Sequence, residues 1–180
     1  GVAKMKLFSE SLCQFFAELP SSQTKFTAIR HSNIYGPHDR FDPERSHVFG
    51  ATIRKVVESQ DGKVVVWGQG KEVRDFLYID DFIKFIEMVI DRQDYKFDVF
   101  NLGSDQPITI AELVRRVVKI SGRELETVYD PQGPALGTKT AIDSSKARRK
   151  FGWQSEISLN EGIKRTLQWY IENKKGDRHV

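Results

Sequence analysis

Segments with the three-to-four-residue apolar spacing of helices alternate with short β-branched runs along this chain, and this alternation limits the fold most strongly. Apolar residues recur at helical spacing from Val2 to Leu19, which predicts an amphipathic helix that ends at Pro20. Five short apolar runs are typical of strands: Phe26–Arg30, Lys63–Trp67, Phe76–Ile79, Val99–Leu102 and Leu125–Tyr129. The order predicts a mixed α/β fold with too few strands for a complete doubly wound sheet.

Capping residues indicate where several helices begin and end. Thr109–Glu112 and Ser158–Glu161 are capping boxes, and we expect the helix after the first of them to close at Gly122. Asp80 or Asp81 is expected to cap another helix. The other predicted elements are helices at Val48–Glu58 and Asp143–Phe151, a long loop at 31–46 and a turn-rich loop at Asp130–Thr140.

Composition excludes several classes of protein. Of the 180 residues 39% are hydrophobic and 29% are charged, with both signs interspersed, which is a globular balance. No apolar run approaches the roughly 20 residues that cross a bilayer, and a net charge of +3 is too small to indicate nucleic-acid binding. The single cysteine, Cys13, is expected to be a small core residue and cannot form a disulfide within the chain. With no secretion-signal pattern, the sequence favours a cytoplasmic location.

Two segments carry the most specific patterns. Residues 33–48 read Asn-Ile-Tyr-Gly-Pro-His-Asp-Arg-Phe-Asp-Pro-Glu-Arg-Ser-His-Val, and residues 70–81 read Gly-Lys-Glu-Val-Arg-Asp-Phe-Leu-Tyr-Ile-Asp-Asp. Tyr-Gly-Pro is also good turn chemistry in any protein, which is the alternative interpretation of the first segment. The planar guanidinium of Arg74 suits a phosphate group. No Gly-x-Gly-x-x-Gly turn occurs, so a dinucleotide site cannot be complete within this chain.

Together these segments resemble the sugar-nucleotide half of the extended short-chain dehydrogenase/reductase family, the NAD-dependent epimerases and dehydratases. The resemblance extends to the tail at 143–153 and is strongest for the GDP-L-fucose synthase branch, mainly through residues 38–48, although Gly50 and Thr52 depart from that branch. The chain opens with Gly1-Val-Ala-Lys4, as if just after the catalytic tyrosine of the family's Tyr-x-x-x-Lys motif. The resemblance implies that residues 1–180 are the C-terminal, substrate-binding part of a Rossmann-like reductase with an incomplete parallel sheet, without the N-terminal dinucleotide-binding half.

The resemblance also implies a nicotinamide cofactor, NADP, with NAD as the alternative, and no metal. Lys4 would bind the nicotinamide ribose and lower the pKa of the tyrosine that donates a proton during hydride transfer. The segment of His31, Ser32, Asn33 and Ile34 would close over the nicotinamide, and Asn33 would also contact substrate. His31 replaces the proline that is usual in the family.

His47 is the second catalytic residue that the resemblance implies. Epimerisation needs one group to remove a C–H proton and another to return a proton on the opposite face. In this reading His47 supplies the acid beside the cofactor and the substrate, and its partner is a cysteine upstream of the tyrosine. The alternative for a lone loop histidine is an exposed or structural role.

The substrate site implied by the resemblance combines basic and aromatic residues. Arg74 would bind the diphosphate, Trp67 and Lys55 would line the pocket, and Arg54 would assist. Lys139 lies in a loop that family members place near the nucleotide. Taken singly, each of these residues could also be a surface charge or a core aromatic.

The implied function of the full-length enzyme is 3,5-epimerisation and NADPH-dependent 4-reduction of GDP-4-keto-6-deoxy-mannose to GDP-L-fucose, while this chain alone is expected to be inactive. The alternatives are another UDP-, dTDP- or CDP-sugar epimerase, dehydratase or reductase, or a non-catalytic sugar-nucleotide-binding fragment. We expect a GDP-sugar as partner, with no nucleic acid and no membrane. Family members are homodimers, so Val2–Leu19 would pack between subunits; packing within its own domain is the alternative.

Overall fold

A computed structural model describes residues 1–133, 137 and 139–174 of the chain. Helices and strands alternate along it, as the sequence predicts. In chain order they are α1 (Val2–Glu18), β1 (Phe26–His31), β2 (Asn33–Tyr35), α2 (Val48–Glu58), β3 (Lys63–Trp67), β4 (Val73–Arg74), β5 (Phe76–Tyr78), α3 (Ile79–Arg92), β6 (Phe97–Leu102), β7 (Ile108–Thr109), α4 (Ile110–Ser121), β8 (Glu126–Asp130), α5 (Ser145–Phe151) and α6 (Leu159–Lys174).

The strands of the described residues pair two by two, which confirms the mixed α/β class and the incomplete parallel sheet. β1 pairs with β6 in parallel over its whole length, from Phe26 opposite Phe97 to His31 opposite Leu102. β2 pairs with β5 and β3 pairs with β8, both in parallel, while β4 and β7 are antiparallel. Parallel strands require crossover connections, and helices supply them here.

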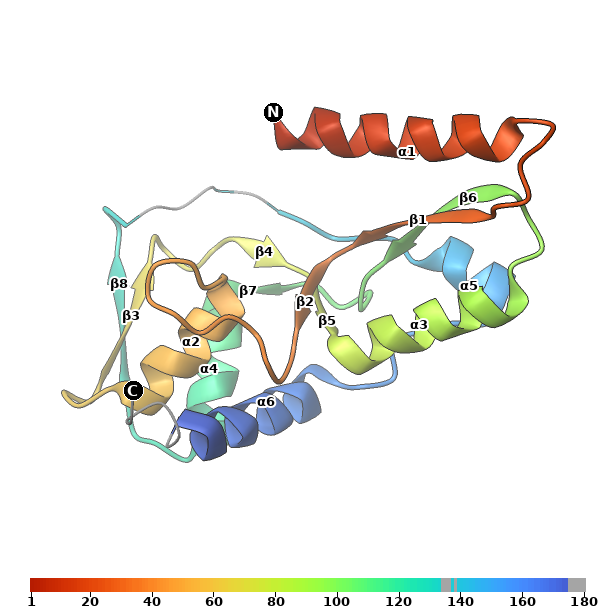
Figure 1. The fold of residues 1–180 in the computed structure, drawn as a ribbon. Helices are drawn as coiled ribbons and strands as arrows, with labels where there is room; N and C mark the ends of the chain where they lie inside the picture. The colour runs from red at the N-terminus through yellow and green to blue at the C-terminus, as the bar shows by residue number, and fades with distance from the viewer. Residues whose placement is uncertain (134–136, 138, 175–180) are drawn as a thin grey trace.

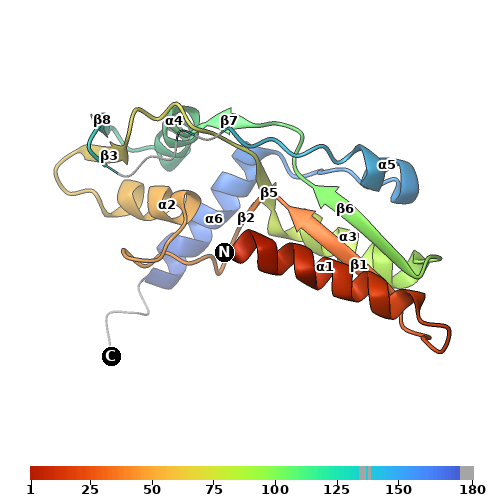
Figure 2. The same ribbon diagram turned by 90° about the horizontal axis from the view of Figure 1, so that it is seen from above.

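The helices cover the strand pairs from different sides. α1 lies along one side of the β1–β6 pair, and α3 and α5 lie along the other (Figure 1). Farther along the molecule, α2, α4 and α6 pack against one another beside β3 and β8, an arrangement that the view from above also shows (Figure 2). These crossovers bring segments from the whole length of the chain to one region.

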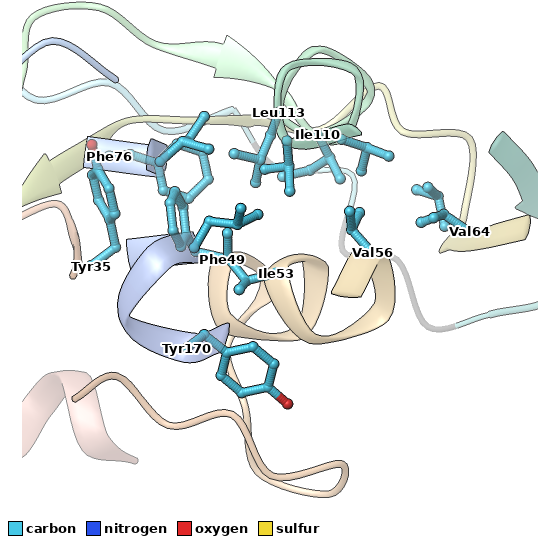
Figure 3. Packing of buried hydrophobic residues seen from close by; sticks show 14 of the residues in the cluster. Tyr35, Phe49, Ile53, Val56, Val64, Phe76, Ile110, Leu113 and Tyr170 are labelled. Atoms are coloured by element: carbon cyan, nitrogen blue, oxygen red, sulfur yellow. The ribbon is translucent and has the colours of Figure 1, made fainter. Parts of the chain in front are cut away.

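Two groups of buried apolar residues hold these layers together. The larger group fills the space between α2, α4, α6 and the strands, and Figure 3 shows Phe49, Ile53 and Leu113 pointing into it. The smaller group lies between α3, β6 and α5, where the Phe85 ring lies 5.5 Å from Phe100 and 5.7 Å from Trp153. Edge-to-face and tilted contacts at these separations add to the burial of the rings.

The predicted cap at the start of α4 is confirmed for Thr109, while the Glu112 carboxylate pairs with Arg115 and Arg116. Thr109 Oγ1 accepts the N–H of Glu112 at 3.1 Å, and α4 closes at Gly122, whose φ of 68° is the left-handed conformation that glycine adopts most easily. We expect Thr109→Ala to lower the free energy of unfolding by about 1 kcal/mol, because one backbone N–H of α4 loses its acceptor. Urea unfolding measures this, and Thr109→Ser, which keeps the hydroxyl, should show less than half of the loss.

The prediction for Asp80 or Asp81 is wrong. The N-cap of α3 is Tyr78, and both aspartates lie inside its first turn. Asp81 is instead buried, and its carboxylate accepts hydrogen bonds from the segment before α6: from Ser155 Oγ at 3.0 Å and from the N–H groups of Glu156 at 3.1 Å and Ile157 at 3.0 Å. It therefore fixes α6 to α3 across 74 or more positions of sequence.

Three very short strands were missed by the sequence analysis. β2 lies within the long loop expected at 31–46, and β4 and β7 pair with each other over only two residues each. These strands are too short for an alternating apolar pattern to be visible, since two or three residues contain no full period. The other predicted strands and helices occur, with ends that differ by at most two residues.

α1 presents most of its apolar side chains to the surface. Ala17 is its one buried residue, whereas Met5 and Phe8 are 71% and 63% exposed. A bidentate ion pair between Arg30 and Glu10 ties α1 to β1. Cys13 is half-buried on α1 rather than in a core. In the part of the chain that is described, no helix combines the length and the apolar character needed to span a membrane.

Candidate functional site

A pocket of about 250 Å³ opens between α2, β3, β4 and the first turns of α4. Its lining includes aliphatic side chains of β3 and α4 and the loop residues Pro43, Glu44 and Ser46. Four of the six predicted substrate-binding residues also line it, namely Arg54, Lys55, Trp67 and Arg74, whereas Asn33 and Lys139 do not. Residues that are 20 positions apart in sequence thus meet at one hollow, which sequence spacing alone does not require.

Helix α2 brings two of these cations to the pocket because it is amphipathic. Phe49, Ile53 and Val56 face the core, which leaves Arg54 and Lys55 half-buried at the pocket wall. The Nε of Arg54 is buried, and no acceptor among the described residues reaches it. A buried donor without an acceptor is unfavourable, so this atom is suited to an anionic ligand.

Lys55 is held against the opposite strand. Its Nζ donates to the carbonyl oxygen of Val65 at 2.9 Å and lies 4.7 Å from the centre of the Trp67 ring. Burial, and then the nearby Arg54 guanidinium, hold the pKa of Lys55 below its ordinary value. A negative ligand would relieve the repulsion between the two cations.

The Trp67 indole is available to a ligand although it ends a strand. It is 52% exposed, because Val64 and Val66 of β3 point into the core and the alternate residues point outward. The turn that follows β8 packs against it: a Cβ on Gly133 would lie 2.8 Å from Cγ and Cδ1 of Trp67. Any larger residue at 133 would have to displace the ring or the turn.

The end of α2 is fixed by a residue that the sequence did not indicate. The guanidinium of Arg123 donates to the carbonyl oxygens of Val56, Val57 and Ser59, which are among the acceptors left open at a helix C-terminus. This clamp holds the last turn of α2 and with it the side of the pocket that carries Lys55. An isolated arginine has no sequence pattern that predicts this role.

Arg74 is placed in the pocket by the short β4–β7 ladder. Glu72 directly precedes β4 and also lines the pocket, and its carbonyl oxygen accepts a hydrogen bond from the N–H of Ile110 at 2.9 Å. Arg74 Nη1 donates to the carbonyl oxygen of Val73 at 3.0 Å. Lys139 forms an isolated bridge with Val73 and is exposed, but it does not line the pocket. The other residues of the predicted nucleotide loop, 134–136 and 138, lie outside the described residues.

A second group of predicted residues lies where β1 ends. The backbone N–H and the Nδ2 of Asn33 both donate to the carbonyl oxygen of Asp75, at 3.1 and 2.9 Å. His31 is exposed, its Nδ1 lies 2.8 Å from the carbonyl oxygen of Ser32, and its ring packs edge-on against Phe82. The Oγ of Ser32 is buried without a partner among the described residues, and Ile34 is half-buried in β2.

Asp75 links the two groups of predicted residues, and the sequence analysis did not single it out. It is fully buried, and its Oδ1 accepts both the N–H and the hydroxyl of Ser104. It stands directly between Arg74 of the pocket and the strand β5 that pairs with β2. Asp75 is part of the 70–81 pattern, but nothing in that pattern indicates that its carboxylate is buried and bonded to Ser104.

His47 and Lys4 lie outside the pocket lining. His47 is the N-cap residue of α2 and is exposed, and Lys4 is exposed on the first turn of α1. In the described ranges, no three His, Cys, Asp or Glu side chains gather in a way that could hold a metal ion. The structure therefore brings four residues of the predicted nucleotide site together, and the predicted catalytic residues lie on other elements, outside the pocket lining.

Comparisons with known proteins agree on one family. The sequence model of the NAD dependent epimerase/dehydratase family matches residues 3–103, more than half of the chain. A probable GDP-L-fucose synthase 1 of Oryza sativa is 37% identical over 176 residues, which are 95% of this chain and 52% of that protein. A GDP-L-colitose synthase of Yersinia pseudotuberculosis is 32% identical over 180 residues, 98% of this chain and 58% of that protein.

Solved structures give the same result at the level of the fold. The UDP-glucose 4-epimerase of Thermotoga maritima, solved with UDP-glucose, superposes with a TM-score of 0.79 at 30% identity. The match covers 93% of this chain and 52% of that chain. The chain thus spans about half the length of the relatives that it matches.

Proposed function

Because the chain belongs to the NAD dependent epimerase/dehydratase family, we propose that its pocket holds the nucleoside diphosphate of a sugar nucleotide. The observation that carries this proposal is the meeting of Arg54, Lys55 and Arg74 with the exposed ring of Trp67 at one pocket. Guanidinium and ammonium groups offset the two phosphate charges, and an indole face stacks on a base. The buried Nε–H of Arg54, which has no acceptor among the described residues, could donate a hydrogen bond to a phosphate oxygen.

The substrate that we propose is a GDP-sugar. The relatives at 37% and 32% identity bear the names GDP-L-fucose synthase and GDP-L-colitose synthase, and both names contain the GDP group. The reaction in the full-length enzyme would be 3,5-epimerisation followed by 4-reduction of a 4-keto-6-deoxy sugar. His47 would return a proton to the sugar carbon, and Asn33, held by Asp75, would position the sugar.

We further propose that the chain is the substrate-binding part of a longer enzyme. The matched relatives are about twice as long, and β1 has a paired strand on one edge only among the described residues. A dinucleotide-binding half would supply the glycine-rich turn. In such an enzyme the exposed apolar residues of α1 would be covered, and a homodimer through Val2–Glu18 is the assembly that we propose.

The residues present fit the nicotinamide end of a dinucleotide cofactor. The buried Ser32 hydroxyl has no partner among the described residues, and Asn33 stands next to it at the end of β1. When bound, NADPH or NADH would supply the hydride. Lys4 would hold the ribose hydroxyls, and the His31–Ile34 segment would exclude water from one side of the ring.

Thermal unfolding with added nucleotide sugars tests the proposal. A ligand at 100 times its Kd stabilises the folded state by about 2.7 kcal/mol, which is a shift of several degrees for a protein of this size. We expect GDP-mannose to raise the Tm of the chain, and dTDP-glucose and UDP-glucose to raise it less at equal concentration.

Each outcome of this titration has a definite meaning. Equal or larger shifts with UDP-glucose or dTDP-glucose would contradict the GDP assignment and favour another sugar-nucleotide epimerase, dehydratase or reductase. No shift with any of the three, repeated on the full-length protein, would contradict the proposed binding site. Turnover of a keto sugar by this chain alone would contradict the proposal that it is only the substrate-binding part.

A further inference from the structure

The loop between β2 and α2 is fixed on both sides. His38 has a φ of 65°, which is uncommon for a residue with a side chain, and its ring packs 4.6 Å from that of Trp169 on α6. On the other side, a Cβ on Gly50 would lie 2.6 Å from the carbonyl oxygen of Arg40, so only glycine allows this approach to α2. Asp39 lies between these two contacts and is therefore held against the first turn of α2.

Only half of the Asp39 carboxylate has a partner in the described part of the chain. Its Oδ1 accepts the N–H of Arg40 at 2.7 Å, whereas Oδ2 is buried and no donor reaches it. An unpaired buried carboxylate oxygen is costly. Burial accordingly raises the pKa of the Asp39 carboxyl, while the Arg40 N–H and the charge of His47 act in the opposite direction.

The geometry of α2 points to His47 as the missing donor. His47 is the N-cap residue and directly precedes the first turn of α2, in which Gly50 lies. Asp39 Oδ2 lies 3.5 Å from the Cβ position of Gly50 and hence beside this turn. The other cation nearby, Arg40, is directed to Asp42, with Nε 3.8 Å from the carboxylate.

We propose that Asp39 is the positioning residue of His47: the ring, which is exposed and not bonded to Asp39 in this structure, turns so that Oδ2 accepts a hydrogen bond from one ring nitrogen and the other nitrogen faces the sugar. The acid role of His47 rests on the proposed function, but the contact between the two side chains does not. A carboxylate partner of this kind fixes the orientation and the tautomer of an imidazole.

The proton balance of the step is simple. The ring nitrogen that faces the sugar gives its proton to the carbanionic carbon next to the keto group, and the new C–H bond uses the electron pair of the enolate. The base on the opposite face releases the proton that it removed from the sugar to solvent, and solvent returns one proton to the ring nitrogen. Asp39 stays ionised throughout and stabilises the positive charge that the ring carries before the transfer.

The contact is tested without substrate by ¹⁵N NMR of the histidine rings in this chain. At about pH 8.5, where an ordinary histidine is neutral, we expect His47 to show one dominant tautomer, with the proton on the nitrogen facing Asp39. Asp39→Ala should return it to the mixture of a free imidazole. Asp42→Asn is the matched control, because Asp42 lies in the same loop and pairs with Arg40. An unchanged tautomer ratio in Asp39→Ala would overturn the proposal.

Stability gives a second readout that separates positioning from a purely structural role. Because burial raises the pKa of Asp39, the ionised carboxyl destabilises the fold above its ordinary pKa, and this cost grows as the pH rises through the folded-state value. Asp39→Asn removes the charge with almost no change of shape, so its Tm at pH 7 should be equal to or higher than that of the wild type. A clearly lower Tm would show that Asp39 serves the fold, and would count against the proposal.

In the full-length enzyme, the proposal predicts a split between kinetic constants. Asp39→Asn should lower kcat for incorporation of solvent deuterium into the sugar by about tenfold to a hundredfold, with KM changed less than twofold. A kcat within twofold of the wild type would overturn the proposal. If the wild type exchanges no deuterium at all, the proposed reaction fails, and the NMR result still decides whether the two side chains are in contact.

Discussion

Replacing Asp81 with alanine is expected to lower the free energy of unfolding by about 3 kcal/mol or more. The carboxylate of Asp81 is 2% exposed and accepts three hydrogen bonds, two of them from the backbone N–H groups of Glu156 and Ile157. Alanine leaves these donors without an acceptor, and each buried unpaired donor costs about 1–3 kcal/mol. Asp81→Asn should also destabilise the chain, though less, since an amide NH₂ would face one of the donors.

Urea unfolding followed by circular dichroism measures this loss. Asp80→Asn is the matched control, because Asp80 is the neighbouring aspartate, is exposed, and lies 3.6 Å from the Arg165 guanidinium in a surface ion pair. Exposed pairs of this kind contribute about 0–1 kcal/mol. If both variants lost the same small amount, Asp81 would not be the anchor of the segment before α6.

Replacing Arg74 with alanine is expected to weaken GDP binding by about tenfold to a hundredfold. Hydrogen bonds from a charged donor to a phosphate contribute about 1.5–3 kcal/mol, and the ammonium of Lys55 cannot reproduce the planar two-pronged geometry of this guanidinium. Arg74→Lys should recover only part of the loss. Isothermal titration calorimetry with GDP, at a fixed low salt concentration, measures the affinity directly.

Arg115→Ala is the control for this measurement. Arg115 is exposed on α4 and pairs with Glu112, and it does not line the pocket. It removes the same charge from the same protein, so any general electrostatic effect on GDP would appear in both variants. Equal losses would mean that Arg74 acts only through the net charge, and an unchanged affinity in Arg74→Ala would remove it from the proposed site.

Much of the fold could be predicted because local signals and tertiary structure agree. The Thr109 and Ser158 capping boxes mark helices that occur, with Ser158 Oγ accepting the N–H of Glu161 at 3.2 Å. The β-branched run Lys63–Trp67 correctly predicts a strand, and the structure shows that one face of this strand is buried. These signals depend on residues that are close in sequence. The tertiary packing of this chain favours the same helices and strands, so the local predictions hold.

The parts that escaped prediction depend on partners far away in sequence. Asp81 was predicted to cap a helix, because aspartate is a preferred N-cap residue. Only the fold shows that its carboxylate oxygens accept hydrogen bonds from residues 155–157 instead. The same holds for Arg123, which closes the end of α2 from 64 or more positions away. The pocket residues were named through a family resemblance, and the spacing of Arg54, Trp67 and Arg74 did not itself require that they meet.

Arg74 and Asp75 are neighbours in the chain, and this limits how the substrate specificity of the proposed site can change. Arg74 reaches the pocket, while the peptide carbonyl of Asp75 holds Asn33 on the neighbouring strand pair. A ligand that pulled on Arg74 would therefore also move the partner of Asn33, so we expect occupancy of the proposed diphosphate end and the position of the proposed sugar end to be thermodynamically linked. We expect that selection for a new sugar would change both ends together, and that specificity variants would arise as compensating pairs on the two sides of the Arg74–Asp75 segment.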